Sequence, residues 1–554
     1  MKLVIVGGGA GGAAAAARAR RLDERAEIVL LERGPDVSLA SCGLPYYAGG
    51  VIFDRAKLFL FTPERLGRRF GLDVRTGSAV RSLDTAARTV EVEEISTGRR
   101  YREPYDYCIL ATGAAPSVPA LPGIDHPAVC AVRTSADIDR IKGRLDGGRV
   151  ERAVVVGGGF IGLEMAENIA ARGAAVEIVE MQGRLLPAMD GEMAVILERH
   201  GAGKGVGLRL GERVAAIIPA GGGGCVVRTS GADLPPAGMV VFCAGVAPET
   251  AIARSAGILM GRTGIVTDRT MRTSDPRVFA VGDAVETEDP VAGGMRCVAL
   301  AGPAARQARV AVNAIFGRED AYRGTLGTAI VKFFEMAAGM TGANEKALKA
   351  AGRRYAKVYL RPPAHAAYYP GATPLAIKLL YDPEGGLLLG AQAVGREGVE
   401  RRIDIFAAAL RHRLSVRDLA ELELCYAPPY GSVRDPVNLA GLAALNTVEG
   451  LVTHVHWDGL SGDEILLDVR NGLEAGKAPV PGALHIPLDE LRGRLAEIPK
   501  GRTVAVFCVS GHRSYIAGRM LAQRGFNAVN ISGGSGAYAD LRDAGMLSRG
   551  APAA

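Results

Sequence analysis

Short apolar runs alternate with glycine-rich turns and with stretches of helical periodicity along most of the chain. The runs "KLVIV" from residue 2, "EIVLL" from 27, "RAVVV" from 152 and "TVAVF" from 503 show almost no alternation of polar and apolar positions. Continuous apolar runs of this length are typical of strands buried on both faces of a parallel sheet. Most of them are followed by a turn and a helical stretch, an order that predicts α/β domains.

The length and the apolar content of the chain indicate several globular domains. With 554 residues and 48% hydrophobic content, and at roughly 100 to 200 residues per domain, we expect about three to five domains. The N-terminal run from Leu3 to Ala17 follows Lys2 as a signal peptide would, but glycines interrupt it in a pattern with its own meaning. No run free of glycine reaches the roughly 18 apolar residues of a membrane span. We therefore expect a cytoplasmic protein without a membrane-spanning segment.

Charge and cysteine content exclude several classes of protein. Lys and Arg number 66 against 59 Asp and Glu, a net charge of +7 that weakly favours anionic ligands. Basic residues are dispersed and aromatic residues make up 5%, so no nucleic-acid partner is expected. The eight cysteines lack CxxC or CxxH spacing. This favours free thiols in a reducing compartment and predicts no metal site.

A dinucleotide-binding motif occupies the N-terminus. After the first apolar run comes Gly7-x-Gly9-x-x-Gly12 and then an alanine-rich helix. Gly7 allows a tight turn, Gly9 allows the backbone to approach a pyrophosphate, and Gly12 allows close helix–strand packing. Glu32 ends the next strand, where a carboxylate would bind ribose hydroxyls.

The same motif recurs in "RAVVVGGGFIGLEMAENIAARGAAVEIVEM". Its glycines are Gly157, Gly159 and Gly162, and Glu180 closes the following strand. A carboxylate there would repel a 2′-phosphate and accept a free 2′-hydroxyl, so NADH is expected in preference to NADPH. Arg184 lies near enough in sequence to soften that preference.

Two further segments carry a family resemblance. "YDYCILATGAAPSVP" and "RVFAVGDAVE", in order and spacing with the two glycine motifs, resemble the FAD-dependent pyridine nucleotide-disulfide oxidoreductases over residues 1 to about 450. In that family the NAD domain interrupts the FAD domain, and the aspartate of the GD motif, here Asp283, bonds the ribityl chain of FAD. The resemblance implies an FAD domain over 1–112 and 245–325, an NAD(P)H domain over 113–244 and an α+β dimerisation domain over 326–450.

The resemblance also implies which positions contact the cofactors. For FAD these are Gly7, Gly9, Ala10, Gly12, Glu32, Arg33, Val80, Thr112, Gly113, Gly282, Asp283 and Ala301. For NADH they are Gly157, Gly159, Phe160, Ile161, Gly162, Glu180 and Gly245.

A single cysteine follows the first motif, in "SLASCGLPYY". Reduced flavin must pass its electrons onward, and Cys42 is the candidate recipient. The next cysteine is Cys108, so no local disulfide partner exists. If Cys42 begins a helix, Pro45 is tolerated in its first turn, and the helix dipole favours a thiolate.

Two chemistries suit one reactive cysteine: a sulfenic acid that reduces peroxide or oxygen, or a mixed disulfide with a small external thiol. The peroxidase and oxidase branch of the family carries a histidine just after the first glycines, where this chain has Ala10. "SLASCGLPYY" instead resembles the coenzyme A-disulfide reductase branch, whose cysteine is held as a mixed disulfide with coenzyme A.

That branch implies further site residues. "HAAYYPGATPL" and "LCYAPPYGSVRDPVN" match segments of its dimerisation domain that lend two tyrosines to the partner subunit's active site, here Tyr368 and Tyr426. A homodimer follows from the resemblance. Candidates for binding coenzyme A are Arg21, Ser38, Ser41, Arg68 and Arg69.

A second thiol site lies at the C-terminus. The loop from Cys508 to Arg513 joins the strand "VAVF" to a helix, so its backbone N–H groups would form an anion-binding nest. Residues Asp468 to about 541 resemble a rhodanese domain, in which this cysteine becomes a persulfide; the domain is expected over 455–554. "LDVR" (Asp468, Arg470) matches its supporting motif. The preceding "THVHWDG" is interpreted as a linker rather than a metal site.

Together these features predict an α/β NADH-dependent flavoenzyme that reduces coenzyme A persulfide, polysulfide or coenzyme A disulfide through Cys42, with Cys508 and Arg513 handling sulfane sulfur. Three alternatives stay open. They are an NADH peroxidase or oxidase using a cysteine sulfenic acid, a thiosulfate:thiol sulfurtransferase with a regulatory flavin domain, and a redox sensor without turnover.

Overall fold

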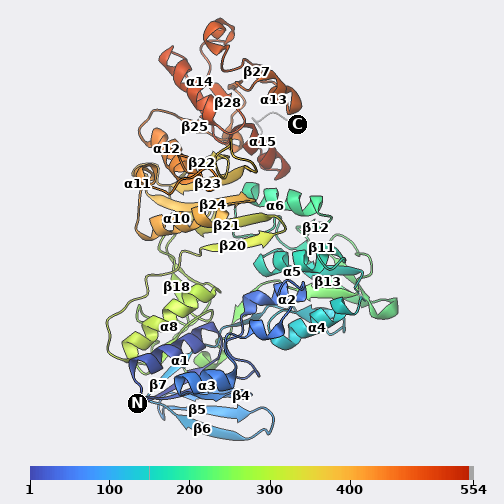
Figure 1. Cartoon of the computed structure of the whole chain (residues 1–554), viewed down its shortest axis with the longest axis vertical. Helices are drawn as coiled ribbons and strands as arrows, with labels where there is room; N and C mark the ends of the chain where they lie inside the picture. The colour runs from blue at the N-terminus through green and yellow to red at the C-terminus, as the bar shows by residue number, and fades with distance from the viewer. Residues whose placement is uncertain (149, 548–554) are drawn as a thin grey trace. The chain divides into compact units, whose positions relative to one another are not determined.

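The computed structural model of the chain (Figure 1) describes residues 1–148 and 150–547. The chain divides into two compact units. The first consists of Met1–Met181 and Val206–Thr325, and the second of Gln182–Gly205 and the chain from Leu326 onward.

The first unit begins with a five-stranded parallel sheet in the order β17-β7-β1-β2-β3. Its strands are β1 (Lys2–Val6), β2 (Glu27–Leu31), β3 (Asp73–Arg75), β7 (Tyr107–Leu110) and β17 (Val278–Ala280). Helices α1 (Ala10–Leu22) and α8 (Ala301–Ile315) pack against each other beside this sheet (Figure 1). Strands β1, β7 and β17 are almost wholly buried, which explains their continuous apolar sequences.

A second parallel sheet repeats this arrangement, in the order β12-β11-β10-β15-β9. Its strands are β9 (Val129–Ala131), β10 (Arg152–Val156), β11 (Ala175–Glu180), β12 (Gly207–Leu210) and β15 (Met239–Phe242). The chain enters this sheet region through β8 (Ala114–Pro116) and leaves it through β16 (Val246–Pro248), and these two strands pair antiparallel. Both sheets therefore have the strand order of a dinucleotide-binding fold, in which ligands bind at the carboxyl ends of the central strands.

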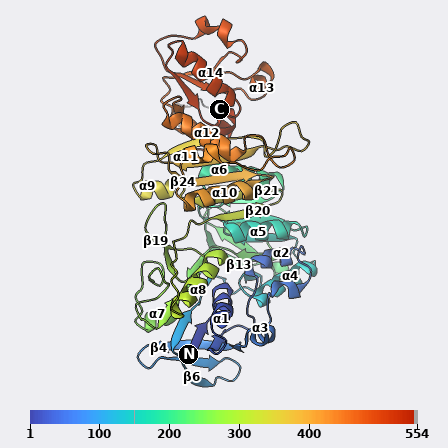
Figure 2. The ribbon, with the colours of Figure 1, turned by 60° about the vertical axis from the view of Figure 1, so that its left-hand side comes forward.

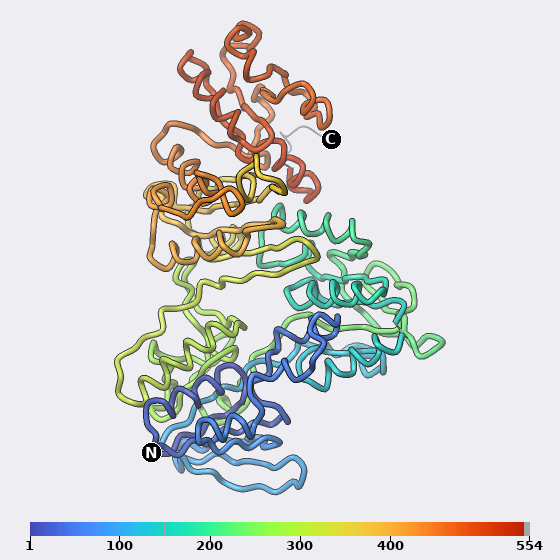
Figure 3. Tube along the Cα trace, in the orientation of Figure 1, coloured from blue at the N-terminus to red at the C-terminus, as the bar shows by residue number. Residues whose placement is uncertain are grey.

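One helix leaves the second sheet region. Between β11 and β12 the chain runs out through α6 (Gly191–Gly203) and back, a path that can be followed in Figure 3. α6 belongs to the second unit, where it packs against β21 (Met336–Gly342) and β24 (Leu388–Gly395). The expected NAD(P)H domain over 113–244 thus lends a helix to the neighbouring unit.

The second unit contains a five-stranded antiparallel sheet, β20-β21-β24-β23-β22. The remaining strands are β20 (Ala329–Phe333), β22 (Ala356–Leu360) and β23 (Leu375–Tyr381). α10 (Val399–Arg411) covers β21 and β24 (Figure 2), and α11 (Val416–Glu421) packs on α12 (Pro436–Val448). A single antiparallel sheet with helices at its face is an α+β arrangement.

A smaller parallel sheet completes this unit, in the order β25-β29-β28-β26-β27. Its strands are β25 (His454–Val455), β26 (Ile465–Asp468), β27 (Leu484–His485), β28 (Val504–Phe507) and β29 (Ala528–Ile531). The helices are α13 (Gly472–Lys477), α14 (His512–Gln523) and α15 (Gly534–Asp543).

The interpretation of "THVHWDG" as a linker is wrong. His454 and Val455 form the edge strand β25 of the small sheet, and the indole of Trp457 is fully buried in its core. The short length of β25 explains the difference. A strand of two residues has too little periodicity to be recognised in a sequence.

Within the described ranges, none of the helices has the length and apolar character needed to cross a membrane.

Candidate active site

The first glycine turn has the conformation that its motif predicts. Gly7 has φ +104°, in the left-handed region, and a Cβ at Gly12 would overlap the carbonyl oxygen of Gly7. A Cβ at Gly9, by contrast, would meet no atom within 4 Å. Since Gly9 directly precedes α1, its open side faces the helix N-terminus, where a pyrophosphate is favoured.

The acid that ends β2 holds this turn closed. Glu32 accepts hydrogen bonds from the backbone N–H of Gly8 (2.7 Å) and of Gly34 (2.7 Å). Next to it, Arg33 pairs with Glu249 at 2.5 Å, and the Thr112 hydroxyl donates to the Glu249 carbonyl at 2.6 Å. These bonds join the end of β2 to the two segments that connect the sheets.

The GD motif lies where two helices begin. Gly11 in the first turn of α1 lies beside Val281, and a Cβ added at Gly11 would lie 3.9 Å from that of Ala304 in α8. Gly282 has φ +86° and donates its N–H to Gln307 of α8 at 2.6 Å. Burial raises the pKa of the neighbouring Asp283. The first turns of α1 and α8 and the carboxyl end of β17 therefore converge here.

The other positions expected for FAD are distributed over several elements of the first unit. Ala10 opens α1, Val80 lies in β4 (Ser78–Asp84), Ala301 opens α8, and Gly113 has φ +71°.

The second glycine turn repeats the first. Gly157 has φ +109°, a Cβ at Gly162 would overlap the Gly157 carbonyl, and Gly159 again faces open space. Glu180 accepts a hydrogen bond from the Gly158 N–H at 2.6 Å. Phe160 and Ile161 open α5 (Phe160–Ala170), and Gly245 has φ +98°.

Arg184 is engaged elsewhere. In the second unit its guanidinium lies 3.3 Å from Glu198 and also donates to the Ala544 carbonyl. The expectation that Arg184 softens the preference for NADH therefore finds no support in this structure.

Cys42 is an exposed free thiol in a turn of 3-10 helix, Ser41–Gly43, which continues into α2 (Leu44–Ala48). Pro45 is the second residue of α2, where its missing N–H costs no helical hydrogen bond. The cysteine thus lies in the first turn of this short helical segment, as the sequence predicts.

Sequence reasoning missed a hydrogen-bonded pair that involves a side chain one helical turn after Cys42. Tyr46, four residues after Cys42, donates from its hydroxyl to Glu164 of α5 at 3.0 Å. Burial raises the pKa of Glu164, and burial together with Glu164 raises the pKa of Tyr46. The i, i+4 spacing of Cys42 and Tyr46 was the available signal, but the acid is more than 100 residues away in the sequence.

Three of the five coenzyme A candidates, the arginines, lie at two helix ends. Arg20 donates to the carbonyls of Phe70 (2.8 Å) and Gly71 (2.7 Å), which ties the end of α1 to the end of α3 (Pro63–Phe70). The exposed Arg21 belongs to the first helix end, and the exposed Arg68 and Arg69 belong to the second. Ser38 is buried with φ +53°, and Ser41 is exposed beside Cys42.

In the second unit, Tyr368 and Tyr426 meet. Their hydroxyl oxygens are 2.7 Å apart, and both side chains are exposed. The hydrogen bond to Tyr368 raises the pKa of Tyr426. Two loops 58 residues apart therefore present one pair of phenols to solvent.

Cys508 lies buried at the end of β28 with its sulfur facing two donors. The Gly511 N–H donates to Sγ at 3.2 Å and the Ser514 hydroxyl at 3.6 Å. Arg513 makes a bidentate pair with Glu474 at 2.7 and 2.8 Å, which lowers the pKa of that carboxyl. The loop is therefore built to surround an anion, although the Arg513 charge is shared with Glu474.

The pair from "LDVR" lies beneath this loop. Arg470 and Asp468 are both buried and form hydrogen bonds of 2.6 to 3.0 Å.

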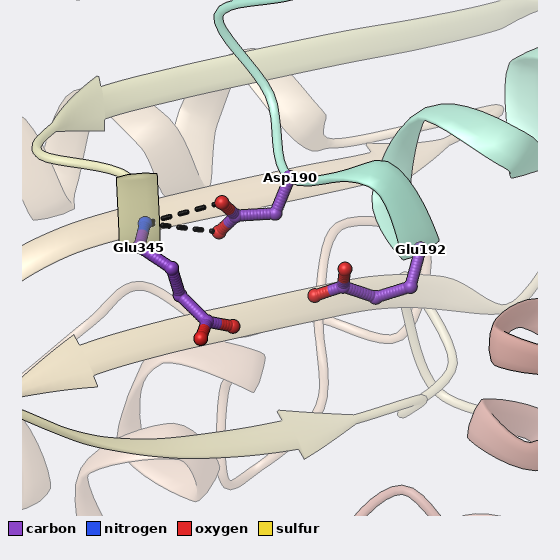
Figure 4. A group of neighbouring side chains, drawn as sticks. All are labelled: Asp190, Glu192 and Glu345. Carbon is purple, nitrogen blue, oxygen red and sulfur yellow. Dashed lines mark hydrogen bonds between the residues drawn. The ribbon is translucent and has the colours of Figure 1, made fainter. Parts of the chain in front are cut away.

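Three acidic side chains of the second unit, Asp190, Glu192 and Glu345, approach one another closely enough to suggest a metal site (Figure 4). The Lys378 ammonium contacts all three, at 2.7 Å from Asp190 and 2.5 Å from Glu345. Lys378 is fully buried, and these carboxylates raise its pKa. A protein cation thus already lies among these carboxylates and offsets part of their negative charge.

Family models of known proteins match segments of both units of the chain. The family model "Pyridine nucleotide-disulphide oxidoreductase" matches residues 1–314, more than half of the chain. The chain belongs to this family. The dimerisation domain of the family matches 328–436, and a rhodanese-like domain matches 453–541. The protein is accordingly a flavin-dependent oxidoreductase with a C-terminal rhodanese domain, and its family uses FAD and NAD(H).

Curated relatives cover the first four fifths of the chain. A coenzyme A disulfide reductase from Staphylococcus aureus is 32% identical over 445 residues, which are 80% of this chain and 99% of the relative. An NADH oxidase from Methanocaldococcus jannaschii is 33% identical over 450 residues, again 80% and 99%.

Two solved structures are similar over nearly the whole chain. Reduced Bacillus anthracis CoADR-RHD is 42% identical with a TM-score of 0.95, covering 98% of each chain. An NAD-dependent persulfide reductase from A. fulgidus is 35% identical with a TM-score of 0.91, covering 97% of this chain and all of the other.

Proposed function

We propose that this protein is an NADH-dependent flavoprotein reductase of coenzyme A persulfide, polysulfide or coenzyme A disulfide, acting through Cys42, and that its rhodanese domain handles sulfane sulfur. The observation that carries the proposal is the exposed thiol of Cys42, in the first turn of a helical segment that packs against the second dinucleotide domain. The similarity to a persulfide reductase over the full chain supports the same function.

The two glycine turns fit the two cofactors. The open space at Gly9 and Gly159 leaves room for a pyrophosphate at each helix N-terminus. Glu32 and Glu180, each hydrogen-bonded to a backbone N–H of its glycine turn, would bind the ribose hydroxyls. FAD, when bound, supplies a two-electron relay between NADH and the thiol. Because the negative charge of the Glu180 carboxylate would repel a 2′-phosphate, NADH is the favoured reductant.

Cys42 would carry the sulfur chemistry. Its thiolate attacks the inner sulfur of coenzyme A persulfide, so that a Cys42–coenzyme A disulfide forms and hydrosulfide leaves. Two electrons and one proton, together the hydride that NADH gives up, would then break this disulfide and restore the Cys42 thiolate and the coenzyme A thiol. The cationic ends of α1 and α3, with Arg21, Arg68 and Arg69, would attract the phosphates of coenzyme A. The exposed Ser41 would line the approach to the thiol, and Ser38 is a further candidate for binding coenzyme A.

Tyr368 and Tyr426 would act in the partner subunit of a homodimer. A hydroxyl pair at a hydrogen-bond distance can stabilise a departing thiolate or return a proton to it, although the raised pKa of Tyr426 makes it a weak acid.

The rhodanese site would carry persulfide sulfur. The Cys508 thiolate would attack the outer sulfur of a persulfide R–S–SH, and the R–S group would leave as the thiol R–SH. The loop N–H groups and Arg513 would hold the new Cys508 persulfide.

An NADH oxidase using a Cys42 sulfenic acid is the second candidate, because one relative has that name. Ala10 disfavours it, since no histidine lies after the first glycines to handle peroxide.

Replacing Cys42 separates these possibilities. Cys42→Ser should reduce NADH oxidation with coenzyme A persulfide to background while the flavin absorbance of the purified protein is unchanged, because a serine hydroxyl is a poor nucleophile at neutral pH. Cys425→Ser, which removes the other exposed cysteine of the described residues, is the matched control and should keep full activity. Persulfide reduction by Cys42→Ser at the wild-type rate would refute the proposal. Faster turnover of the wild type with oxygen or peroxide than with coenzyme A persulfide would favour the oxidase.

A further inference from the structure

The Cys508 loop rests on the first turn of α15. The Ser535 N–H donates to the Cys508 carbonyl at 2.7 Å, and the Gly536 N–H donates to the Val509 carbonyl at 3.1 Å. The Trp457 indole N–H donates to the Gly534 carbonyl at 2.8 Å. Because the first N–H groups of a helix have no partner within it, these bonds link the position of the loop backbone to that of α15.

The glycines of "SGGSG" bring this turn close to the dimerisation sheet. A Cβ at Gly534 would overlap the Cys508 carbonyl, and a Cβ at Gly533 would lie 2.7 Å from the Cβ of Tyr359 in β22. A Cβ at Gly536 would lie 2.6 Å from Cδ of Arg361, just after β22. The Tyr359 N–H also donates to the Ser532 hydroxyl at 2.8 Å. The helix start is therefore packed between the Cys508 loop and the end of β22.

Arg361 contacts α15 at two successive turns. Its stem lies against Gly536, and its guanidinium pairs with Asp540, one turn further along the same face. Asp540 is 4% exposed and also pairs with Arg199 of α6. Burial and the nearby Arg199 lower the pKa of Arg361 to about 10, so it keeps its charge at neutral pH.

We propose that Arg361 of the dimerisation domain is a positioning residue for sulfur transfer at Cys508, acting through α15. This inference rests on the proposed sulfur-transfer role of Cys508. By holding α15 at Gly536 and Asp540, Arg361 sets the loop so that the Gly511 N–H points at the sulfur. The rhodanese site is then complete only when it is docked on the dimerisation sheet.

The test compares two replacements of Arg361 in the full-length protein. Arg361→Met keeps most of the stem and removes the ion pair, whereas Arg361→Lys keeps a cation that reaches Asp540. In thiosulfate:cyanide sulfurtransfer, Arg361→Met should lower kcat roughly tenfold, as small misplacements of catalytic groups do, with little change in KM. Arg361→Lys should recover most of this loss.

A second readout distinguishes positioning from general destabilisation. Alkylation of Cys508 by iodoacetamide, followed on its own peptide by mass spectrometry, should shift to higher pH in Arg361→Met, because the loop N–H groups would no longer be aimed at the thiolate. Asp540→Asn should show the same shift if Arg361→Met does not fold. Asp543→Asn is the matched control, since Asp543 lies on the same helix and pairs with Arg199 at 2.9 Å but not with Arg361. It should leave both readouts unchanged.

The outcomes separate this inference from the proposed function. If Cys508→Ser retains sulfurtransfer, the role of Cys508 itself is wrong. If Cys508→Ser is inactive but Arg361→Met matches the wild type in kcat and in the alkylation profile, the rhodanese role holds and the positioning role is overturned. An equal loss of kcat in Arg361→Met and Arg361→Lys would also contradict the positioning role of Arg361. So would a loss of kcat in Asp543→Asn as large as that in Arg361→Met.

Discussion

At the scale of single residues, the proposed preference for NADH rests on Glu180. Its carboxylate is buried and already fixed by the Gly158 N–H, so it cannot turn away from an incoming 2′-phosphate without losing that bond. Arg184, which could have offered a compensating charge, is paired with Glu198.

Glu180→Ala should narrow the preference for NADH. Loss of a hydrogen bond to a charged group, about 1.5 to 3 kcal/mol, should lower kcat/KM for NADH roughly ten- to a hundredfold, while the value for NADPH rises or stays constant. Steady-state kinetics with both cofactors measures this. Glu177→Gln on the same strand is the control, because Glu177 pairs with Arg209. A wild-type preference for NADPH would contradict the assignment.

At the scale of elements, the turn between β10 and α5 contains one glycine that we expect to be needed for NADH binding and another that we expect to be needed for folding. A Cβ at Gly159 meets open space, whereas a Cβ at Gly162 overlaps the Gly157 carbonyl. The two glycines thus have different physical reasons for being glycine.

Replacing each of them by alanine should reveal this difference. Gly159→Ala should raise KM for NADH roughly tenfold or more through misplacement of the dinucleotide, with Tm unchanged. Gly162→Ala should lower Tm by roughly 5 °C, because overpacking costs about 1 to 3 kcal/mol. Thermal unfolding and NADH titrations test both. The interpretation fails if Gly159→Ala binds NADH normally.

The edge strand β25 makes the rhodanese domain sensitive to acid. Burial lowers the pKa of His454 to about 4, and the pKa of His456 is also well below its usual value. Between pH 6.5 and 4 the unfolded chain binds protons that the folded histidines do not, so stability is greatest above pH 6.5 and falls as the pH falls. The cost from His454 is at most about 3 kcal/mol.

Trp457, the only tryptophan of the chain, lies in this core and reports its unfolding. In denaturant unfolding followed by its fluorescence, the denaturant concentration at the midpoint should decrease as the pH is lowered from 7.5 to 5. The decrease should be smaller in His454→Gln. His412→Gln, at an exposed position, should behave as the wild type. Equal pH dependence in all three proteins would show that His454 does not contribute.

At the scale of the whole molecule, two thiols are placed in separate units. Cys42 and both glycine turns lie in the first unit, and Cys508 lies in the second. Gly511 and Ser514 donate hydrogen bonds to Cys508, and Tyr46, one turn after Cys42, is held by Glu164.

Cys508→Ser should therefore divide the activities. Sulfur transfer from thiosulfate to thiols should be lost, while NADH-dependent reduction of coenzyme A persulfide, which can reach Cys42 directly, should be preserved. Larger or poorly soluble sulfur donors should suffer more, because they need loading through Cys508. A relay between the thiols predicts single-turnover transfer of labelled sulfur from Cys508 to coenzyme A. Equal reduction of all donors by Cys508→Ser would rule out the relay.

Several features follow from sequence alone because their causes are local. The strands β1 and β10, the glycine turns after them and the acids Glu32 and Glu180 depend on residues within one strand–turn–helix unit, where spacing determines geometry. The Cys508 loop is local in the same sense. These units can be predicted from the sequence because each contains a backbone position with positive φ, which few residue types other than glycine adopt.

Other features were decided only by the tertiary structure. Lys378 meets Asp190 and Glu345, Arg361 meets Asp540, and Tyr368 meets Tyr426 across long stretches of sequence. α6 leaves the domain of its neighbours in sequence to pack on another sheet. Each residue taken alone looks like an ordinary charged or aromatic side chain. Its partner is set by which surfaces bury apolar area together, and that choice depends on the packing of the whole chain rather than on spacing along it.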